Sequence, residues 1–166
     1  MNKVHTEYYY DKKLIKVKDS EIGDVFELAQ NLRESDKREV WRSHHHTPED
    51  ALLKGLTNST SCFTVERNEK PIAMFGVAPE NLLSSEAHVW LLASPELGKI
   101  KKAFLMNSPK FIHMMLDQYP LIYNWVDIEN DDSINWLTWC GAEWGIIKPY
   151  GVEQKSFQYF QFKRRV

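Results

Sequence analysis

Apolar and polar residues alternate with a period of two in several short segments of this chain. This alternation predicts β-strands with one face in the core, because successive side chains of a strand point to opposite faces. Residues 71–78 are almost entirely apolar, which indicates a strand buried on both faces. The predicted strands are residues 14–17, 62–66, 71–78, 86–93, 123–128, 144–147 and 156–163.

Other segments carry apolar residues at helical spacing. The predicted helices are residues 19–31, 49–56, 94–119 and 130–141. Thr47 and Asn130 are expected to cap helix starts, and Gly141 is expected to end the last helix in a left-handed conformation. Pro109 predicts a kink or a restart within the long helix. The charged segment 33–41 is expected to form a separate turn or helix.

The resulting order is β-α-α-β-β-β-α-β-α-β-β, which predicts an α+β fold. The sheet should be mixed but mostly antiparallel and flanked by helices, with a parallel pair where the long helix joins two strands. At 166 residues the chain is long enough for one core, so we expect a single domain over residues 14–166. Residues 1–13 are polar with three consecutive tyrosines, and we expect them to form an N-terminal arm.

Charge and hydropathy narrow the partners and the compartment. The net charge of −2 and the pI near 6.3 argue against general nucleic-acid or anionic-membrane binding. No apolar run reaches membrane-spanning length, and residues 1–13 have no apolar core of a signal peptide, so we expect a protein that is not secreted. Cys62 and Cys140 lie in apolar strings without metal-type spacing, which favours buried thiols in a reducing compartment.

Aromatic residues make up 13% of the chain, including six tryptophans. They can fill the core or form an exposed docking surface, and their strand or helix periodicity favours the core. His44, His45 and His46 invite a metal hypothesis. Adjacent residues do not face one way on a helix or strand, so the pattern favours a polar loop and no metal site.

The element order, with the pattern N-x-x-S at Asn130 and with Gly141 closing the helix, resembles the GNAT superfamily of acyl-CoA N-acyltransferases over residues 14–163. Three strings are more narrowly similar to a family of short-tailed phage proteins with a GNAT-like fold, typified by internal virion protein A. These strings are IAMFGV (72–77), VWLLASPEL (89–97) with KAFL (102–105), and YPLIYNWVDIENDDSINWLTWCGAEW (119–144). The closing string FQYFQFKRR adds to the match.

The GNAT resemblance implies a CoA site at the turn that opens the long helix, where backbone N–H groups hold the phosphates. The implied cofactor-binding residues are Leu92, Ser94, Gly98, Lys99 and Asn130. The turn departs from the family pattern Q/R-x-x-G-x-G/A, because Ile100 fills the second small position and Pro95 lacks an N–H donor. Glu96 also adds a negative charge close by.

The resemblance further implies a tyrosine that protonates the leaving thiolate, seven residues after the motif asparagine. Leu137 stands at that position and has no proton to give. The candidate catalytic bases are Glu86, His88 and Asp127, each of which is also explained as an ordinary polar strand or loop residue. Tyr123 and Tyr150 are the other hydroxyls considered for the missing acid.

Three functions follow from this pattern. The first is a phage virion- or assembly-associated protein with a degenerate acyl-CoA site, which would bind other phage proteins in the host cytoplasm or the particle. The second is an active acetyl-CoA-dependent N-acetyltransferase acting on a host protein or small amine. The third is a domain that binds acyl-CoA without turnover. An open separation of the strands at Trp90 and Trp125 would favour the functions that use acyl-CoA.

Overall fold

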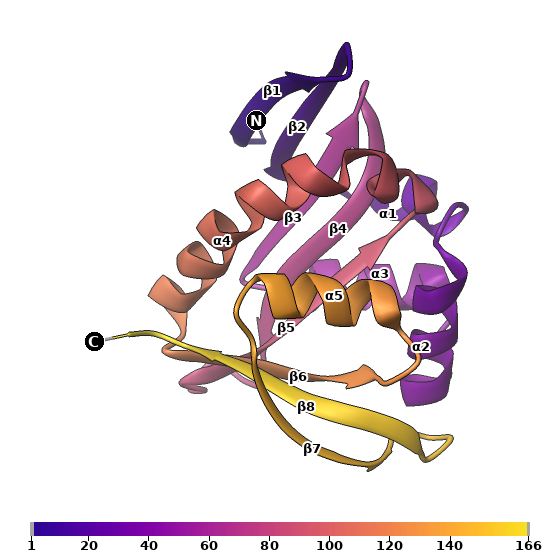
Figure 1. Cartoon of the computed structure of the whole chain (residues 1–166), viewed down its shortest axis with the longest axis vertical. Coiled ribbons are helices and arrows are strands. Elements are labelled where there is room, and N and C mark those ends of the chain that lie inside the picture. The colour runs from indigo at the N-terminus through magenta and orange to yellow at the C-terminus, as the bar shows by residue number, and fades with distance from the viewer. Residues whose placement is uncertain (1, 166) are drawn as a thin grey trace.

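The computed structural model describes residues 2–165, within which eight strands form one sheet in the order β1-β2-β3-β4-β5-β6-β8-β7 (Figure 1). The strands are β1 (Val4–Tyr10), β2 (Lys13–Asp19), β3 (Ser61–Arg67), β4 (Lys70–Pro79), β5 (Glu86–Ala93), β6 (Leu121–Asp127), β7 (Glu143–Tyr150) and β8 (Lys155–Lys163). Neighbouring strands are antiparallel except β5 and β6, which are parallel. The predicted α+β fold with a mostly antiparallel sheet is therefore confirmed.

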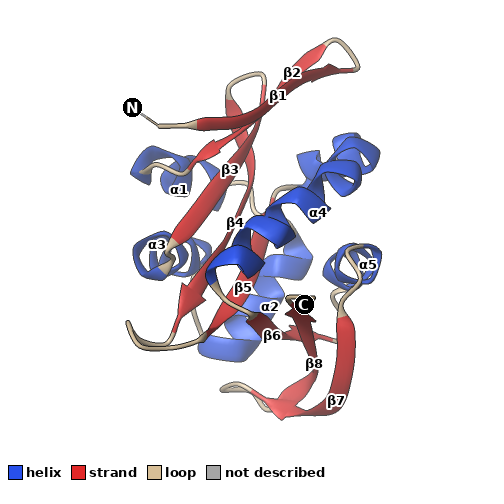
Figure 2. Ribbon diagram, turned by 90° about the vertical axis from the view of Figure 1, so that its left-hand side faces the viewer, coloured by secondary structure: helices blue, strands red, loops and turns tan. Residues whose placement is uncertain are grey.

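The helices lie on both faces of this sheet, with α1 and α3 on one side and α4 and α5 on the other (Figure 2). They are α1 (Ile22–Ala29), α2 (Glu34–His44), α3 (Pro48–Asn58), the 3₁₀ helix η1 (Pro95–Ile100), α4 (Lys101–Gln118) and α5 (Asp131–Trp139). Thr47 caps α3, Asn130 caps α5, and Gly141 follows α5 with a φ of 87°, as expected. None of the helices in the described part is both long and apolar enough to cross a membrane.

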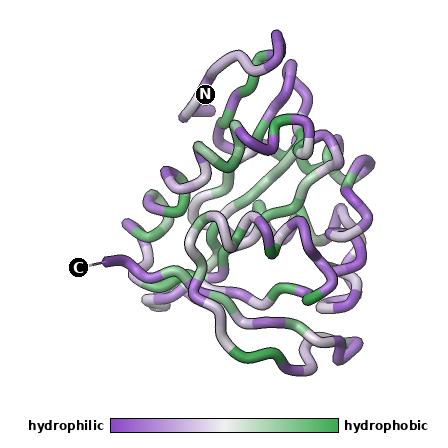
Figure 3. The backbone as a smooth tube through the Cα atoms, viewed as in Figure 1, coloured by the Kyte–Doolittle hydropathy of each residue, from purple (hydrophilic) through white to green (hydrophobic). Residues whose placement is uncertain are grey.

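Strand β4 lies between two apolar clusters and is buried on both faces, as its sequence predicts. Met74 packs with Val25, Leu28 and Leu52 under α1 and α3. Its neighbours Ala73 and Phe75 face the larger cluster under α4 and α5. Figure 3 shows the hydrophobic positions concentrated in the central strands. Because successive side chains of β4 point to opposite faces of the sheet, this strand contacts the helices on both sides.

Most aromatic side chains belong to this core. Phe63, Phe75 and Phe111 form a cluster with ring centroids 5.2 to 5.3 Å apart. Trp136 is buried, whereas Trp41 and Trp139 are exposed. The core interpretation of the aromatic content therefore holds for most of these residues.

Two elements differ from the predicted order. Residues 4–10, expected within an N-terminal arm, form β1, which pairs antiparallel with β2 through a turn with positive φ at Asp11 and Lys12. Residues 34–44 form α2, so the loop expected at the histidines begins only after His44. Both segments are rich in polar residues because one face of each is exposed, and this weakened their periodic signal.

The helix does not restart at Pro109, because α4 continues through this residue. A proline lacks the N–H that would bond the carbonyl of residue i−4, which here is Leu105. The indole Nε1 of Trp139 donates to that carbonyl oxygen at 2.9 Å, so the acceptor is satisfied by another helix. The change of helix type occurs earlier, where η1 passes into α4 at Ile100.

Candidate functional site

Strands β5 and β6 are paired over only part of their length. The parallel pairing runs from Glu86–Leu121 to His88–Tyr123 and then stops. The last contact is a side-chain bond, in which Asn124 Nδ2 donates to the carbonyl oxygen of Val89 at 3.0 Å. Beyond it the strands separate at Trp90 and Trp125, which is the opening that the resemblance implies for an acyl-CoA protein.

The opening exposes a backbone donor and a backbone acceptor of β5. Val89 bonds across the gap through its carbonyl, and Ala93 bonds the start of α2 through Arg33 N–H and the Asp36 carboxylate, each at 2.9 Å. Groups of alternate residues face the same strand edge. The N–H and C=O of Leu91 therefore face the opening, and they have no partner on that edge within residues 2–165.

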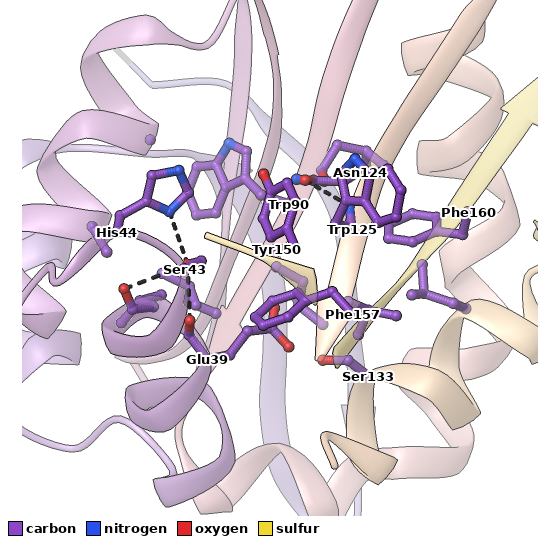
Figure 4. A pocket seen from close by; sticks show the side chains of 18 of the residues that line it. Glu39, Ser43, His44, Trp90, Asn124, Trp125, Ser133, Tyr150, Phe157 and Phe160 are labelled. Atoms are coloured by element: carbon purple, nitrogen blue, oxygen red, sulfur yellow. Dashed lines mark hydrogen bonds between the residues drawn. The ribbon is translucent and has the colours of Figure 1, made fainter. Parts of the chain in front are cut away.

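A cavity of roughly 200 Å³ fills the opening, and we call it the acceptor cavity (Figure 4). Its wall comes from both faces of the sheet: α2 and α3 on one side and α5 on the other. Strands β5 to β8 contribute aromatic rings and aliphatic side chains. Labelled wall residues in Figure 4 include Glu39, Ser43, His44, Trp90, Trp125, Ser133, Tyr150 and Phe157.

A second cavity of roughly 260 Å³ lies at the start of η1 and α4, and we call it the turn cavity. Arg33, Ser94, Gly98 and Lys101 line it. Leu91 and Trp136 line both cavities, so the two lie side by side at the exposed edge of β5. We call the two adjacent cavities together the channel.

The implied phosphate turn is open at Gly98, where an added Cβ would meet no heavy atom within 4 Å. Lys99 bonds Glu96 at 2.7 Å and does not line the turn cavity; Lys101 does. Glu96 also pairs with Arg67 at 3.0 Å and lines a different cavity. Its charge is therefore compensated away from the channel.

Of the other implied cofactor residues, two line the cavities and one lies behind the cavity wall. Ser94 lines the turn cavity, where its Oγ accepts from Glu96 N–H at 3.3 Å, and Leu92 lines the acceptor cavity. Asn130 lines neither cavity. It is fully buried, its Oδ1 accepts from Ser133 N–H, and its Nδ2 donates to carboxylates of α2. Asn130 therefore supports the site from behind.

The three catalytic candidates from the sequence lie outside the wall of the acceptor cavity. Glu86 is exposed at the start of β5. His88 packs edge-on against Tyr123, and burial lowers its pKa. Asp127 is buried and bonds Arg42 Nη1 at 2.9 Å through Oδ2. Leu137 does line the cavity and is 2% exposed, so α5 presents an apolar side chain at the acid position.

Glu39 is a wall residue that the sequence did not single out. Its Oε2 accepts from Asn130 Nδ2 at 2.8 Å and from Asp127 N–H at 3.2 Å. Burial, reinforced by the negative charges of Asp36 and Asp127, raises the pKa of Glu39 to about 8. Its Oε1 has no hydrogen-bond partner within residues 2–165. Only its helical spacing from Asp36 could have signalled that both acids share the buried face of α2.

Tyr150 lines the acceptor cavity (Figure 4), and the turn after it bonds the end of α2, where Val152 N–H donates to the Ser43 carbonyl oxygen at 3.0 Å. Its ring stacks on Trp125 with centroids 5.3 Å apart. Burial, with a smaller contribution from the negative charge of Glu39, raises the pKa of Tyr150. A phenol hydroxyl from β7 therefore belongs to the cavity wall, beside the aliphatic hydroxyls of Ser43 and Ser133.

The backbone conformation of His45 sets the positions of its two neighbouring histidines. His45 is the C-cap of α2 and has a left-handed conformation with a φ of 54°. This turn brings the rings of His44 and His46 together, stacked at 5.1 Å, and both line the acceptor cavity. Within residues 2–165, no group of three or more His, Cys, Asp or Glu side chains is placed to hold a metal.

Known structures share this architecture. The ribosomal-protein-S5-alanine acetyltransferase from Vibrio fischeri aligns with a TM-score of 0.64 and 14% identity over 96% of this chain and 97% of that one. The spermidine N-acetyltransferase from Vibrio cholerae in complex with CoA and spermine aligns with a TM-score of 0.64 and 16% identity over 90% and 95%. Ard1 from Thermoplasma volcanium aligns with a TM-score of 0.61 and 14% identity over 92% and 99%.

These similarities show that the chain has the fold of the GNAT acetyltransferases. At such identities they show the fold alone. No family model matches the chain, and no curated protein matches it. The resemblance to phage internal virion proteins receives no support from these comparisons.

Proposed function

We propose that the protein binds an acyl-CoA in the channel between β5 and β6 and transfers the acyl group to an amine. The observation that carries this proposal is that two cavities lie side by side where β5 and β6 separate. The turn cavity and the acceptor cavity share Leu91 and Trp136 as wall residues. A donor and an acceptor can therefore approach the same point from opposite faces.

The residues of the channel fit an acyl-CoA. Lys101 places positive charge beside the open Gly98, where a pyrophosphate needs it, while Arg33 in the same wall is paired with Asp36 at 2.8 Å and Asp132 adds a carboxylate. The free N–H and C=O of Leu91 suit the amides of a pantetheine arm. Ser94 and Pro95 leave the turn with fewer amide donors than a glycine-rich turn offers, so the side-chain cations must carry more of the phosphate binding.

The bound thioester would supply an activated acyl group. The chain would hold the amine among the side chains of the acceptor cavity, where Trp90 and Trp125 exclude water and Glu39 presents a carboxyl oxygen. Tyr150 would give a proton to the leaving sulfur, in place of the tyrosine that the resemblance implies at position 137. A phenol with a raised pKa keeps its proton at neutral pH and can donate it to a thiolate formed beside it.

Leu137 also favours a second candidate, in which the domain binds acyl-CoA without turnover. Position 137 offers no hydroxyl, and the wall hydroxyls of Ser43 and Ser133 are much weaker acids than a phenol, so transfer depends on Tyr150. A role in phage assembly among other virion proteins, in the host cytoplasm or the particle, stays a prediction from the sequence. Detection of the protein in purified particles would test it.

Calorimetric titration with acetyl-CoA and CoA tests the proposal. We expect binding in the micromolar range or tighter, and we expect Gly98→Glu to abolish it by placing bulk and negative charge in the turn cavity. Gly23→Glu on α1 is the matched control, because an added Cβ there also meets nothing within 4 Å and the site is remote from the channel. Absence of binding by the unaltered protein rejects both candidates that use acyl-CoA.

A thiol-release assay with acetyl-CoA and a panel of primary amines separates the two candidates. Transfer to at least one amine, with the acetylated product seen by mass spectrometry, supports catalysis. Tight binding without transfer to any amine supports the binding-only function.

A further inference from the structure

The histidine triplet divides its rings between the acceptor cavity and the outer surface. His45 stacks on Trp41 with centroids 4.6 Å apart and does not line the cavity. His44 and His46 lie in the wall with their rings nearly parallel, 16° apart. Two imidazoles thus face the space assigned to the amine, and their hydrogen bonds show which one has a free nitrogen.

Ser43 sets the proton position on His44. The Ser43 hydroxyl donates to the carbonyl oxygen of Glu39 at 2.8 Å. A hydroxyl has a single proton, so its oxygen must accept in its 2.8 Å contact with His44 Nδ1. In a neutral imidazole with the proton on Nδ1, the other nitrogen Nε2 has a lone pair and acts as an acceptor.

His46 has no free lone pair at Nε2. Its Nε2 lies 3.1 Å from the Lys54 ammonium, which has only donors, so the lone pair of His46 Nε2 is already engaged. Nε2 of His44 has no hydrogen-bond partner within residues 2–165. Of the two imidazoles in the cavity wall, His44 therefore has the available basic nitrogen.

The surroundings keep His44 neutral. Partial burial lowers its pKa first, and the positive charge of Lys54 from α3, together with the protonation of His46 or of His88 from β5, lowers it further. Ser43 is its hydrogen-bond partner on α2 and is uncharged. At neutral pH the imidazole is thus in the form that accepts a proton.

We propose that His44 accepts, at Nε2, the proton that the amine loses during acyl transfer. This inference rests on the proposed function. In that step the amine nitrogen bonds to the thioester carbonyl carbon and the carbon–sulfur bond breaks. One amine proton moves to His44 Nε2, and the sulfur leaves as a thiolate that takes a proton from the Tyr150 hydroxyl. The imidazolium then releases its proton to solvent, and the phenolate takes one back. Neither oxidant nor metal enters the balance.

Kinetics of the full chain test this role. The probes are acetyl-CoA with spermidine and with a lysine-containing peptide, using whichever amine reacts faster. We expect His44→Gln to lower kcat roughly 100-fold or more with little change in the KM for acetyl-CoA. We also expect kcat/KM of the unaltered protein to rise through an apparent pKa below 6.5, and this step to vanish in the variant.

His45→Asn is the matched control, because it changes the neighbouring histidine outside the cavity and asparagine accepts positive φ. It should retain the activity of the unaltered protein. Imidazole ¹⁵N NMR gives a separate readout. The His44 signals should show the proton on Nδ1, and Ser43→Ala should mix the two tautomers and lower kcat by roughly tenfold.

Three outcomes would overturn the assignment. One is a His44→Gln variant with unchanged kcat. Another is a pH profile with an apparent pKa near 8 that Glu39→Gln abolishes, which would identify Glu39 as the proton acceptor. The third is absence of transfer to both amines, which rejects His44 together with turnover. Acetyl-CoA binding in calorimetry would then show that the binding site itself stands.

Discussion

Asn124 marks the point where the sheet divides, because its Nδ2 donates to the carbonyl oxygen of Val89 at 3.0 Å just beyond the last paired residues of β5 and β6. A side chain thus replaces the next backbone bond of the ladder. The bond holds the near end of the channel at a fixed width while the strands separate beyond it.

Replacing Asn124 with leucine should weaken this junction. The carbonyl of Val89 would lose its donor in a half-buried place, so we expect the free energy of unfolding to fall by about 1 kcal/mol, measured by urea denaturation. Acetyl-CoA affinity should fall as well. Asn31→Leu removes an exposed 3.3 Å bond to the Glu27 carbonyl and should have little effect. Equal losses in both variants would contradict the role of Asn124.

Gly55 gives Trp90 room to lie against α3. An added Cβ at residue 55 would stand 2.5 Å from Trp90 Cζ2. Gly55→Ala should therefore displace the indole, break its 2.9 Å bond to Ser59 Oγ and cost roughly 1–3 kcal/mol by overpacking. Thermal denaturation and tryptophan fluorescence measure the two effects. Gly23→Ala meets no neighbour within 4 Å and should instead stabilise α1 slightly.

Glu39 should give the protein a measurable loss of stability with rising pH. Its pKa rises from 4.5 to about 8 on folding, so the folded state holds a proton that the unfolded state has released between these values. Stability due to this group is complete below pH 4.5 and is lost as pH rises through 8.

Glu39→Gln removes this titration. We expect the variant to gain stability relative to the unaltered protein as pH rises from 4.5 to 8, by a few kcal/mol at most. Urea denaturation at several pH values measures the difference. A difference that does not change with pH would mean that Glu39 titrates normally.

Tyr150→Phe tests the proposed proton donor. The ring, its stacking on Trp125 and its place in the wall would remain, while the hydroxyl is lost. We expect kcat with acetyl-CoA and the reactive amine to fall roughly 100-fold, with acetyl-CoA affinity retained. Tyr159→Phe, on the neighbouring strand and outside the cavity wall, should leave kcat close to that of the unaltered protein.

Both cysteines should react slowly with alkylating reagents while the protein is folded. Burial raises the pKa of Cys62 to about 11 and that of Cys140 to about 12, from 9.0. The thiolate fraction at neutral pH, and with it the rate, should fall roughly 100-fold and 1000-fold. Mass spectrometry after iodoacetamide treatment, with urea-unfolded protein as the control, measures this. Both residues are half-buried, and fast labelling of the folded protein would contradict the shielding of their thiols.

Some parts of the site follow from local sequence. Asn130 and Gly141 bound α5 as expected, because capping bonds and a left-handed residue depend on neighbours within one turn. The strand–helix order around Ser94 and Gly98 likewise follows from periodicity, and it places both residues at the start of η1. The nearly continuous apolar run of β4 correctly predicts burial on both faces.

Other parts depend on contacts between distant segments. Glu39 belongs to a charged stretch, and its raised pKa exists only because Asn130 and Asp127 close over it. Leu105 keeps its acceptor satisfied through Trp139, so Pro109 leaves α4 unbroken.

The sequence by itself determined the strands, most helices, the caps of α5 and the apolar residue at 137, because these depend on spacing along the chain. Only the tertiary structure decided which side chains face the channel. In the structure, Asn130 lies behind the cavity wall and Lys99 bonds Glu96 outside the turn cavity. Glu39 and His44 from α2 and Tyr150 from β7 line the same cavity. The physical reason is that the cavity lies where β5 and β6 separate, and its wall comes from elements whose approach no local pattern encodes.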